Sequence, residues 1–254
     1  MKKVEVCCKL SAMLRLKTYP FGVKFFEDLN ERPSRTMRPR YPMNVCQITA
    51  VARYYGRAIY FTAEDMACIV GGVALGLLPE PETMKNGKIA KMLHADLESA
   101  KEFTSTVPKI PFGRFKAVAV APLFKLNFEP DIIAMYGNTE QIMRVIQGYL
   151  YKKGGRVNFS TGGEWSLCAD TIAQSYVKQD ISLGLPCFGD RKTAFAQEGE
   201  VSIAFPYNMY DEIIEGMQAT EDVAPYPVPF DIGFPQMPDY TLTSWAVEYR
   251  KKQR

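Results

Sequence analysis

The sequence predicts an α+β (mixed α/β) fold in which short-stranded sheets pack against helices. Segments with helical spacing of apolar residues alternate irregularly with shorter apolar segments typical of strands. The chain has 254 residues, 47% of them hydrophobic and 23% charged, as in an ordinary globular protein. We expect one domain over residues 1–224, which could divide into pseudo-symmetric halves at 1–103 and 117–224. A proline-rich tail, residues 225–254, should pack on this body.

The expected elements of the first half follow from apolar spacing and from the positions of proline and glycine. They are a helix at 3–17, a strand at 21–26, a loop rich in arginine and proline at 30–42, a helix at 46–55, a strand at 58–61 and an amphipathic helix at 84–103. Gly56 should end the second helix, and Thr62 with Asp65 resembles a capping box. In the first strand, Lys24 belongs to the face opposite Val23 and Phe25.

The second half should contain further short strands and helices. Strands are expected at 117–123, 131–136 and 200–205, and helices at 139–151, 166–177 and 208–217. Asn138 stands at the position that caps the first of these helices. The same helix N-terminus, at Tyr136-Gly137-Asn138, could instead bind an anion, and the two interpretations remain open.

Composition excludes several classes of function. His94 is the single histidine, so histidine-rich zinc centres and two-metal histidine sites are ruled out, and its polar neighbours indicate a surface residue. A net charge of +3 is too small to indicate nucleic-acid binding. The apolar run from Met66 to Leu78 is shorter than the roughly 20 residues of a membrane span. Glu5 and Lys9 interrupt any secretory signal, so we expect a cytoplasmic protein with reduced thiols.

The cysteines are the most informative residues. Four of them form two pairs, Cys46 with Cys68 and Cys168 with Cys187. The two segments resemble each other at matched spacing: Cys46, Thr49 and Tyr54 correspond to Cys168, Thr171 and Tyr176. If this is an internal repeat, an approximate two-fold axis would bring all four thiols together. Cys7 and Cys8 are adjacent on the first helix and are expected to face the core.

Spacing alone leaves three interpretations of these cysteines open. They are inert core residues, ligands of an iron–sulfur cluster, or a zinc site or reactive thiol. No Cys-x-x-Cys motif occurs, which weakens both zinc and thioredoxin-type redox chemistry. Single cysteines on separate elements suit a cluster buried between them.

Several motifs, in this order, are similar to those of the uncharacterised domain-of-unknown-function family number 169. They are Phe21-Gly22-Val23-Lys24-Phe25, Cys46-Gln47, Glu64-Asp65-Met66-Ala67-Cys68, Gly71-Gly72, Leu75-Gly76-Leu77, Pro130-Asp131-Ile132-Ile133, Tyr136-Gly137-Asn138, Cys168 and Leu185-Pro186-Cys187-Phe188-Gly189-Asp190-Arg191. The resemblance covers residues 12 to about 218. It implies that Cys46, Cys68, Cys168 and Cys187 belong to the shared pattern and form a metal centre, while Cys7 and Cys8 do not. It implies no reaction.

Other residues are candidates for chemistry around this centre. Lys24, Tyr136 and Arg191 are the candidate catalytic residues, because a lysine on an apolar strand and an arginine next to Cys187 can bind or neutralise an anion. The candidate substrate-binding residues are Asn138, Asp190, Gly71 and Gly72. Structural ion pairs, a helix cap and close glycine packing are the alternatives. The arginines at 32–40 could grip a carboxylate or phosphate, or could form a solvated loop.

These observations lead to one main hypothesis and two alternatives. The main one is an oxygen-sensitive, cytoplasmic [4Fe-4S] protein of anaerobic metabolism, a lyase, hydratase or redox enzyme that acts on a small anionic molecule. The first alternative is an electron-transfer or accessory protein with a protein redox partner. The second is a small-molecule-binding domain with a structural zinc (Zn) site made of four cysteines. Neither nucleic acid nor membrane is expected as a partner, and a homo-oligomer remains open.

Overall fold

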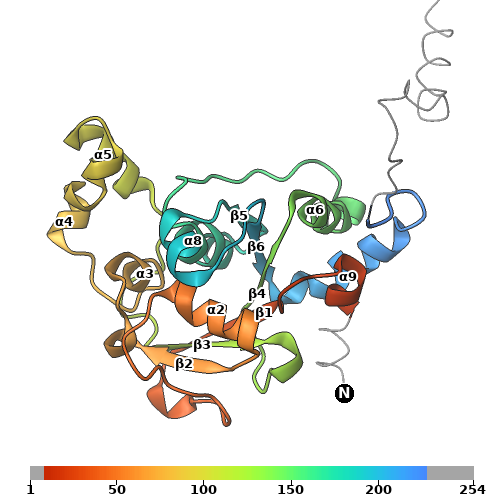
Figure 1. Ribbon diagram of the computed structural model, residues 1–254, viewed down its shortest axis with the longest axis horizontal. Coiled ribbons are helices and arrows are strands. Elements are labelled where there is room, and N and C mark those ends of the chain that lie inside the picture. Colours follow the sequence, from red (N-terminus) through yellow and green to blue (C-terminus); the bar gives the residue numbers. More distant parts are fainter. Residues whose placement is uncertain (1–8, 228–254) are drawn as a thin grey trace, which may run out of the picture.

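We describe residues 9–227 of a computed structural model of the chain (Figure 1). Its strands are β1 (Phe21–Phe26), β2 (Ile59–Thr62), β3 (Ala117–Pro122), β4 (Ile132–Gly137), β5 (Ser182–Gly184) and β6 (Val201–Pro206). Its α-helices are α2 (Val45–Tyr55), α3 (Ile69–Ala74), α4 (Glu82–Lys85), α5 (Leu97–Thr106), α6 (Thr139–Lys153), α7 (Gln174–Lys178), α8 (Phe188–Ala194) and α9 (Tyr210–Ala219), after a helical segment at 9–14. A π-helix (Ser166–Ala173) precedes α7, and short 3-10 turns join several elements. The predicted α+β class is confirmed.

The strands form a single open antiparallel sheet in the order β2-β3-β1-β4-β6-β5. Residues 21–122 and residues 132–206, called the two halves from here on, each contribute three strands in the same arrangement. From the outer edge of the sheet to its centre, the strands of the first half are β2, β3 and β1, and those of the second half are β5, β6 and β4. Exchanging the halves therefore maps β1 onto β4, β2 onto β5 and β3 onto β6.

The hydrogen-bond register obeys the same exchange. The central ladder pairs Phe21 with Ala134, Gly22 with Ile133, and Val23 with Ile132. Exchanging the halves leaves this set of pairs unchanged: the Gly22–Ile133 pair stays in place, and the Phe21–Ala134 and Val23–Ile132 pairs exchange positions. The outer ladders also correspond. Pro122 pairs with Phe21 as Pro206 pairs with Ile132. Val120 pairs with Ile59 as Ala204 pairs with Ser182. A pseudo-two-fold axis thus passes through the centre of the sheet, approximately along its normal.

Alternation along the strands separates two main layers of apolar side chains. Val23 and Phe25 join the larger core, which α2, α3 and the π-helix complete on one face. Ile133 and Met135 face the other side, where α6 and α9 cover the second half of the sheet. Lys24 alternates away from the larger core, as the sequence predicts. Figure 1 shows α4 and α5 projecting from this body.

The structure corrects the expected helix at 84–103. Gly87 has a positive φ of 77° and breaks it after α4. A Cβ atom at this position would lie 2.4 Å from the backbone nitrogen of Lys101. His94 is extended, and Asp96 then caps α5 through the backbone N–H of Ser99. Local backbone geometry therefore overrides a continuous amphipathic pattern.

The sequence also missed short elements. It described 66–78 as core or a glycine-rich loop, where the chain forms α3, and it gave no element for β5 or α8. Residues 1–8, which include part of the first predicted helix, and the tail at 228–254 lie outside the described residues. Within the described part of the chain, no helix combines the length and the apolar character that crossing a bilayer would require.

The contact between α6 and α9 gives a direct test of this packing. A Cβ atom on Gly148 would lie 2.5 Å from the carbonyl oxygen of Ile213, on the facing helix. Gly148→Ala should therefore lower the free energy of unfolding by about 1–3 kcal/mol, through overpacking. Gly189→Ala is the matched control, because its Cβ would meet only Cys187 Sγ at 3.9 Å. Urea denaturation followed by circular dichroism compares the two, and equal stabilities would contradict the close helix crossing.

Candidate functional site

The four cysteines of the repeated pattern all lie at the beginnings of helices. Cys46 is in the first turn of α2 and Cys168 in the first turn of the π-helix, and the pseudo-two-fold relates these two elements. Cys68 and Cys187 directly precede α3 and α8, and they are equivalent in the same way. All four are free thiols and partly buried. Each half therefore contributes two cysteines in matching positions.

The four thiols interact with one another. Burial raises the pKa of the Cys46 thiol to about 12, and negative charge on Asp190, Cys187 or Cys68 contributes to this rise. Burial likewise raises the pKa of Cys168, to which Cys68, Cys187 and Cys46 add. The elements that carry these cysteines also pack together: α2 contacts α8 and the π-helix, and α3 contacts the π-helix. Convergence of the quartet is what an internal two-fold predicts.

Backbone N–H groups approach two of the sulfurs. The N–H of Gly71 donates to Cys68 Sγ at 3.4 Å. Burial raises the pKa of the Cys187 thiol, and hydrogen bonds from the backbone of Asp190 and Ser166 oppose this rise. Hydrogen bonds of this kind stabilise thiolates and tune iron–sulfur clusters.

The sulfurs are not arranged around a single small ion. Among residues 9–227, no group of three or more histidine, cysteine or acidic side chains has the spacing to hold one metal ion. With Zn–S bonds of about 2.3 Å, a tetrahedral zinc site made of four thiolates would hold its sulfurs about 3.8 Å apart. Four thiolates are a donor set used both by iron–sulfur clusters and by structural zinc sites.

A buried polar network lies next to Cys46 and Cys187. The Tyr136 hydroxyl donates to Asp190 Oδ2 at 2.6 Å, and the guanidinium of Arg53 stacks 3.5 Å from the centre of the Tyr136 ring. Arg53 also pairs with Glu200 at 2.7 Å. Asp190 is fully buried. Among residues 9–227, neither Asp190 Oδ1 nor Arg53 Nη1 has a hydrogen-bond partner. Unpaired buried polar atoms are costly and frequently mark functional sites.

Burial dominates the protonation of this network. It raises the pKa of Asp190 to about 6, although the Tyr136 hydroxyl and Arg53 oppose the shift. It also raises the pKa of Tyr136, to which the charge of Asp190 adds. Tyr136 therefore remains a hydrogen-bond donor at neutral pH. Asp190 has a pKa close enough to neutrality to exchange protons, which suits a general acid or base.

The structure places the other predicted site residues apart from the thiols or in structural roles. Lys24 forms an ion pair with Asp131 at 2.8 Å on the opposite face of the sheet. Arg191 is exposed and donates to the carbonyl oxygens of Pro186 and Gln197. Asn138 caps α6 by accepting a hydrogen bond from the N–H of Gln141.

The predicted glycines sit in tight packing. A Cβ atom on Gly71 would lie 2.9 Å from Val45, and one on Gly72 would lie 2.5 Å from Leu78. Both glycines are buried, and their small size lets α3 pack closely beside Cys68.

Arg53 and Glu200 are the site residues that sequence reasoning missed. Arg53 lies seven residues after Cys46 on α2, so helical periodicity places both on the same face with Thr49. The sequence offered one signal for Arg53, because it is a charged residue on the apolar face of a predicted helix. Glu200 follows a loop, and its partnership with Arg53 joins segments 147 residues apart, for which spacing gave no signal.

The high pKa of Asp190 predicts a pH dependence of stability in the metal-free, reduced protein. Between pH 3.8 and about 6, the folded state holds a proton that the unfolded chain has released. The free energy of unfolding should therefore fall by about 3 kcal/mol as pH rises through this window, and it stays lower at neutral pH. Asp190→Asn should remove this component, whereas Asp211→Asn, at an exposed position, should not. Denaturation curves at pH 4 and pH 7 measure it; identical pH dependence in wild type and Asp190→Asn would contradict the buried carboxyl.

Comparisons with known proteins agree with the motifs. The model of the DUF169 family, described as uncharacterised ArCR, matches residues 9–216. The uncharacterized protein MJ0308 of Methanocaldococcus jannaschii is 33% identical over 213 residues, which cover 83% of this chain and 91% of that protein. No solved structure matches the chain. The matched region contains the whole sheet and all four cysteines of the repeated pattern, and the chain belongs to the DUF169 family.

Proposed function

We propose that this protein binds a [4Fe-4S] cluster through Cys46, Cys68, Cys168 and Cys187, and that it is an oxygen-sensitive enzyme acting on a small anionic metabolite. The observation that carries the proposal is that the four cysteines stand at the beginnings of α2, α3, the π-helix and α8, and that these elements pack against one another. Four cysteine ligands are the usual donor set of such a cluster. The pseudo-two-fold supports the same ligand set, because each half supplies two equivalent cysteines.

The surrounding residues support an enzyme over a simple electron carrier. Bound with three protein ligands, the cluster would supply a Lewis-acidic iron; with four, it would supply electrons. Asp190 and Tyr136 share a hydrogen bond beside the thiols, and a pKa of about 6 lets Asp190 hold or release a proton near neutral pH. An electron-transfer protein has no need for such an acid–base pair. Arg53 adds a buried cation that can balance negative charge in this region.

Two alternatives give distinct results in a metal analysis. An electron-transfer or accessory protein would bind the cluster without responding to metabolites. A small-molecule-binding domain with a structural zinc held by the four cysteines would contain zinc instead. The absence of a Cys-x-x-Cys motif favours the cluster over the second alternative.

Anaerobic purification provides the decisive test. The protein should be brown, absorb broadly near 400 nm and contain about four irons per chain. Cys46→Ser, Cys68→Ser, Cys168→Ser and Cys187→Ser should each lose or convert the cluster. Cys7→Ser and Cys8→Ser, outside the described residues, are the matched controls and should retain it. A colourless protein with one zinc, or full iron content in all four variants, would contradict the proposal.

Electron paramagnetic resonance of the reduced protein separates the enzyme from the electron carrier. Addition of candidate hydroxy acids should change the spectrum if a substrate approaches the cluster. Asp190→Asn should keep the iron while weakening the spectral response to the acid. A spectrum that no tested acid alters would favour the electron-transfer alternative.

Cluster assembly should depend steeply on pH. Because burial raises the pKa of Cys46 and Cys168, both thiols are protonated in the metal-free protein at neutral pH and must lose their protons on ligation. Reconstitution with iron and sulfide should therefore become more complete from about pH 6.5 to about pH 8.5 and should release protons. Iron content after desalting measures the effect, and a loading yield independent of pH would argue against thiolate ligation.

A further inference from the structure

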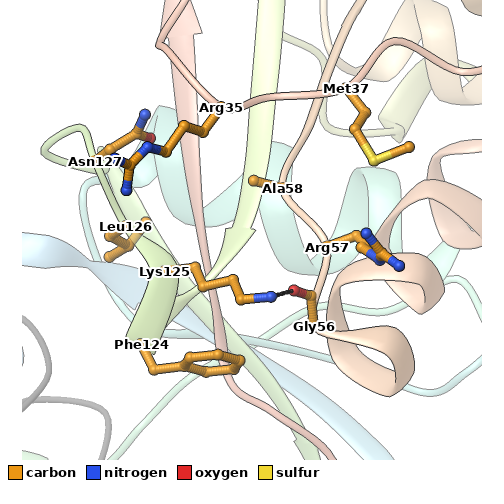
Figure 2. A pocket seen from close by; sticks show the side chains of 9 residues that line it. All are labelled: Arg35, Met37, Gly56, Arg57, Ala58, Phe124, Lys125, Leu126 and Asn127. Atoms are coloured by element: carbon orange, nitrogen blue, oxygen red, sulfur yellow. Dashed lines mark hydrogen bonds between the residues drawn. The ribbon is translucent and has the colours of Figure 1, made fainter.

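A pocket of about 560 Å³ lies at the C-terminal end of α2, far from the cysteines. Its walls come from the loop at residues 35–37, the segment 56–58 that directly follows α2, and the turn at 124–127, as Figure 2 shows. Cys46 and Gly56 stand ten positions apart in sequence, at opposite ends of the helix, so the two sites are separated by about 15 Å along its axis. A volume of this size is typical of small-molecule sites.

Among residues 9–227, every charged side chain that lines the pocket is positive. These side chains are Arg35, Arg57 and Lys125. Within the same residues, neither Arg35 nor Arg57 has an ion-pair partner. Lys125 donates a hydrogen bond to the carbonyl oxygen of Gly56 at 2.7 Å, which offsets the negative end of the α2 dipole. Unpaired cations around a cavity attract a multiply charged anion.

The pocket is held in shape by contacts between its walls. The Asn127 amide donates to the backbone carbonyl of Ser34 and so ties the arginine loop to the turn at 124–127. Arg35 has a positive φ of 60°, a backbone conformation that costs energy in a residue other than glycine. Figure 2 shows Arg35 and Asn127 on one side, Arg57 and Met37 on the other, and Lys125 between them. A ligand placed here would meet cations from opposite directions.

We propose that this pocket binds a phosphorylated small molecule. Guanidinium groups bind phosphate oxygens in bidentate fashion, and Lys125 adds a point charge. Phe124, Met37 and Leu126 supply an apolar part of the lining, which suits an organic portion attached to the phosphate. The volume fits one small molecule, and a net charge of +3 is too small to indicate nucleic-acid binding. This site is independent of the metal centre proposed above.

Calorimetric titration of the full chain with inorganic pyrophosphate tests the proposal. Wild type should bind, and Arg57→Gln should lower the affinity about tenfold or more through loss of a charge-assisted contact. Arg35→Gly should also weaken binding, while its melting temperature stays at or above that of wild type because glycine accepts the left-handed backbone. Retained stability would separate lost binding from misfolding.

Arg40→Gln is the matched control. Arg40 is exposed on the same loop but does not line the pocket, so its replacement removes the same charge and should leave the affinity within about twofold of wild type. Absence of wild-type binding at millimolar pyrophosphate would overturn the proposal. Equal weakening by Arg40→Gln and Arg57→Gln would also overturn it, since binding would then reflect diffuse surface charge only.

Discussion

The antiparallel pairing of β1 with β4 is the constraint on which the rest of the structure depends. It joins the two halves at the Gly22–Ile133 pair and fixes their relation as an approximate two-fold. The same exchange aligns the outer ladders and carries α2 onto the π-helix. The two cysteines of one half thereby occupy positions that match those of the other half. The helix α2, which carries Cys46, packs against α8, which directly follows Cys187, although the two segments lie far apart in sequence.

Burial then sets the chemistry of the region between the helices. It keeps the thiols of Cys46 and Cys168 protonated in the absence of metal, and it holds the carboxyl of Asp190 near the point where it exchanges a proton. Arg53 lies in the same region, in an ion pair with Glu200 and stacked on the Tyr136 ring. Such a network is costly to bury unless its members are paired. The basic pocket at the other end of α2 has the opposite character: its arginines are exposed and, within residues 9–227, have no ion-pair partner.

The sequence revealed those parts of the fold and site that local spacing encodes. The matched Cys-x-x-Thr patterns pointed to a two-fold, and alternation around Lys24 placed that residue on the correct face. Gly87 could not be distinguished from a tolerated helix glycine, because its backbone conformation depends on contact with α5. Strand β5 has three residues, and α8 carries no clear apolar stripe, so periodicity had too little to detect. Partnerships such as Arg53 with Glu200 exist only once the sheet is assembled.

The position of β1 in the sheet affects how the chain is made. Of the six strands in the sheet, the first to leave the ribosome is an interior strand, flanked on one side by β3 and on the other by β4. Its backbone hydrogen-bonding groups have no sheet partners until residues 117–137 have also emerged. During that interval the nascent chain carries an apolar segment with both edges available for pairing with other chains. Productive folding of this protein therefore depends on the shielding of residues 21–26 throughout synthesis of the first half.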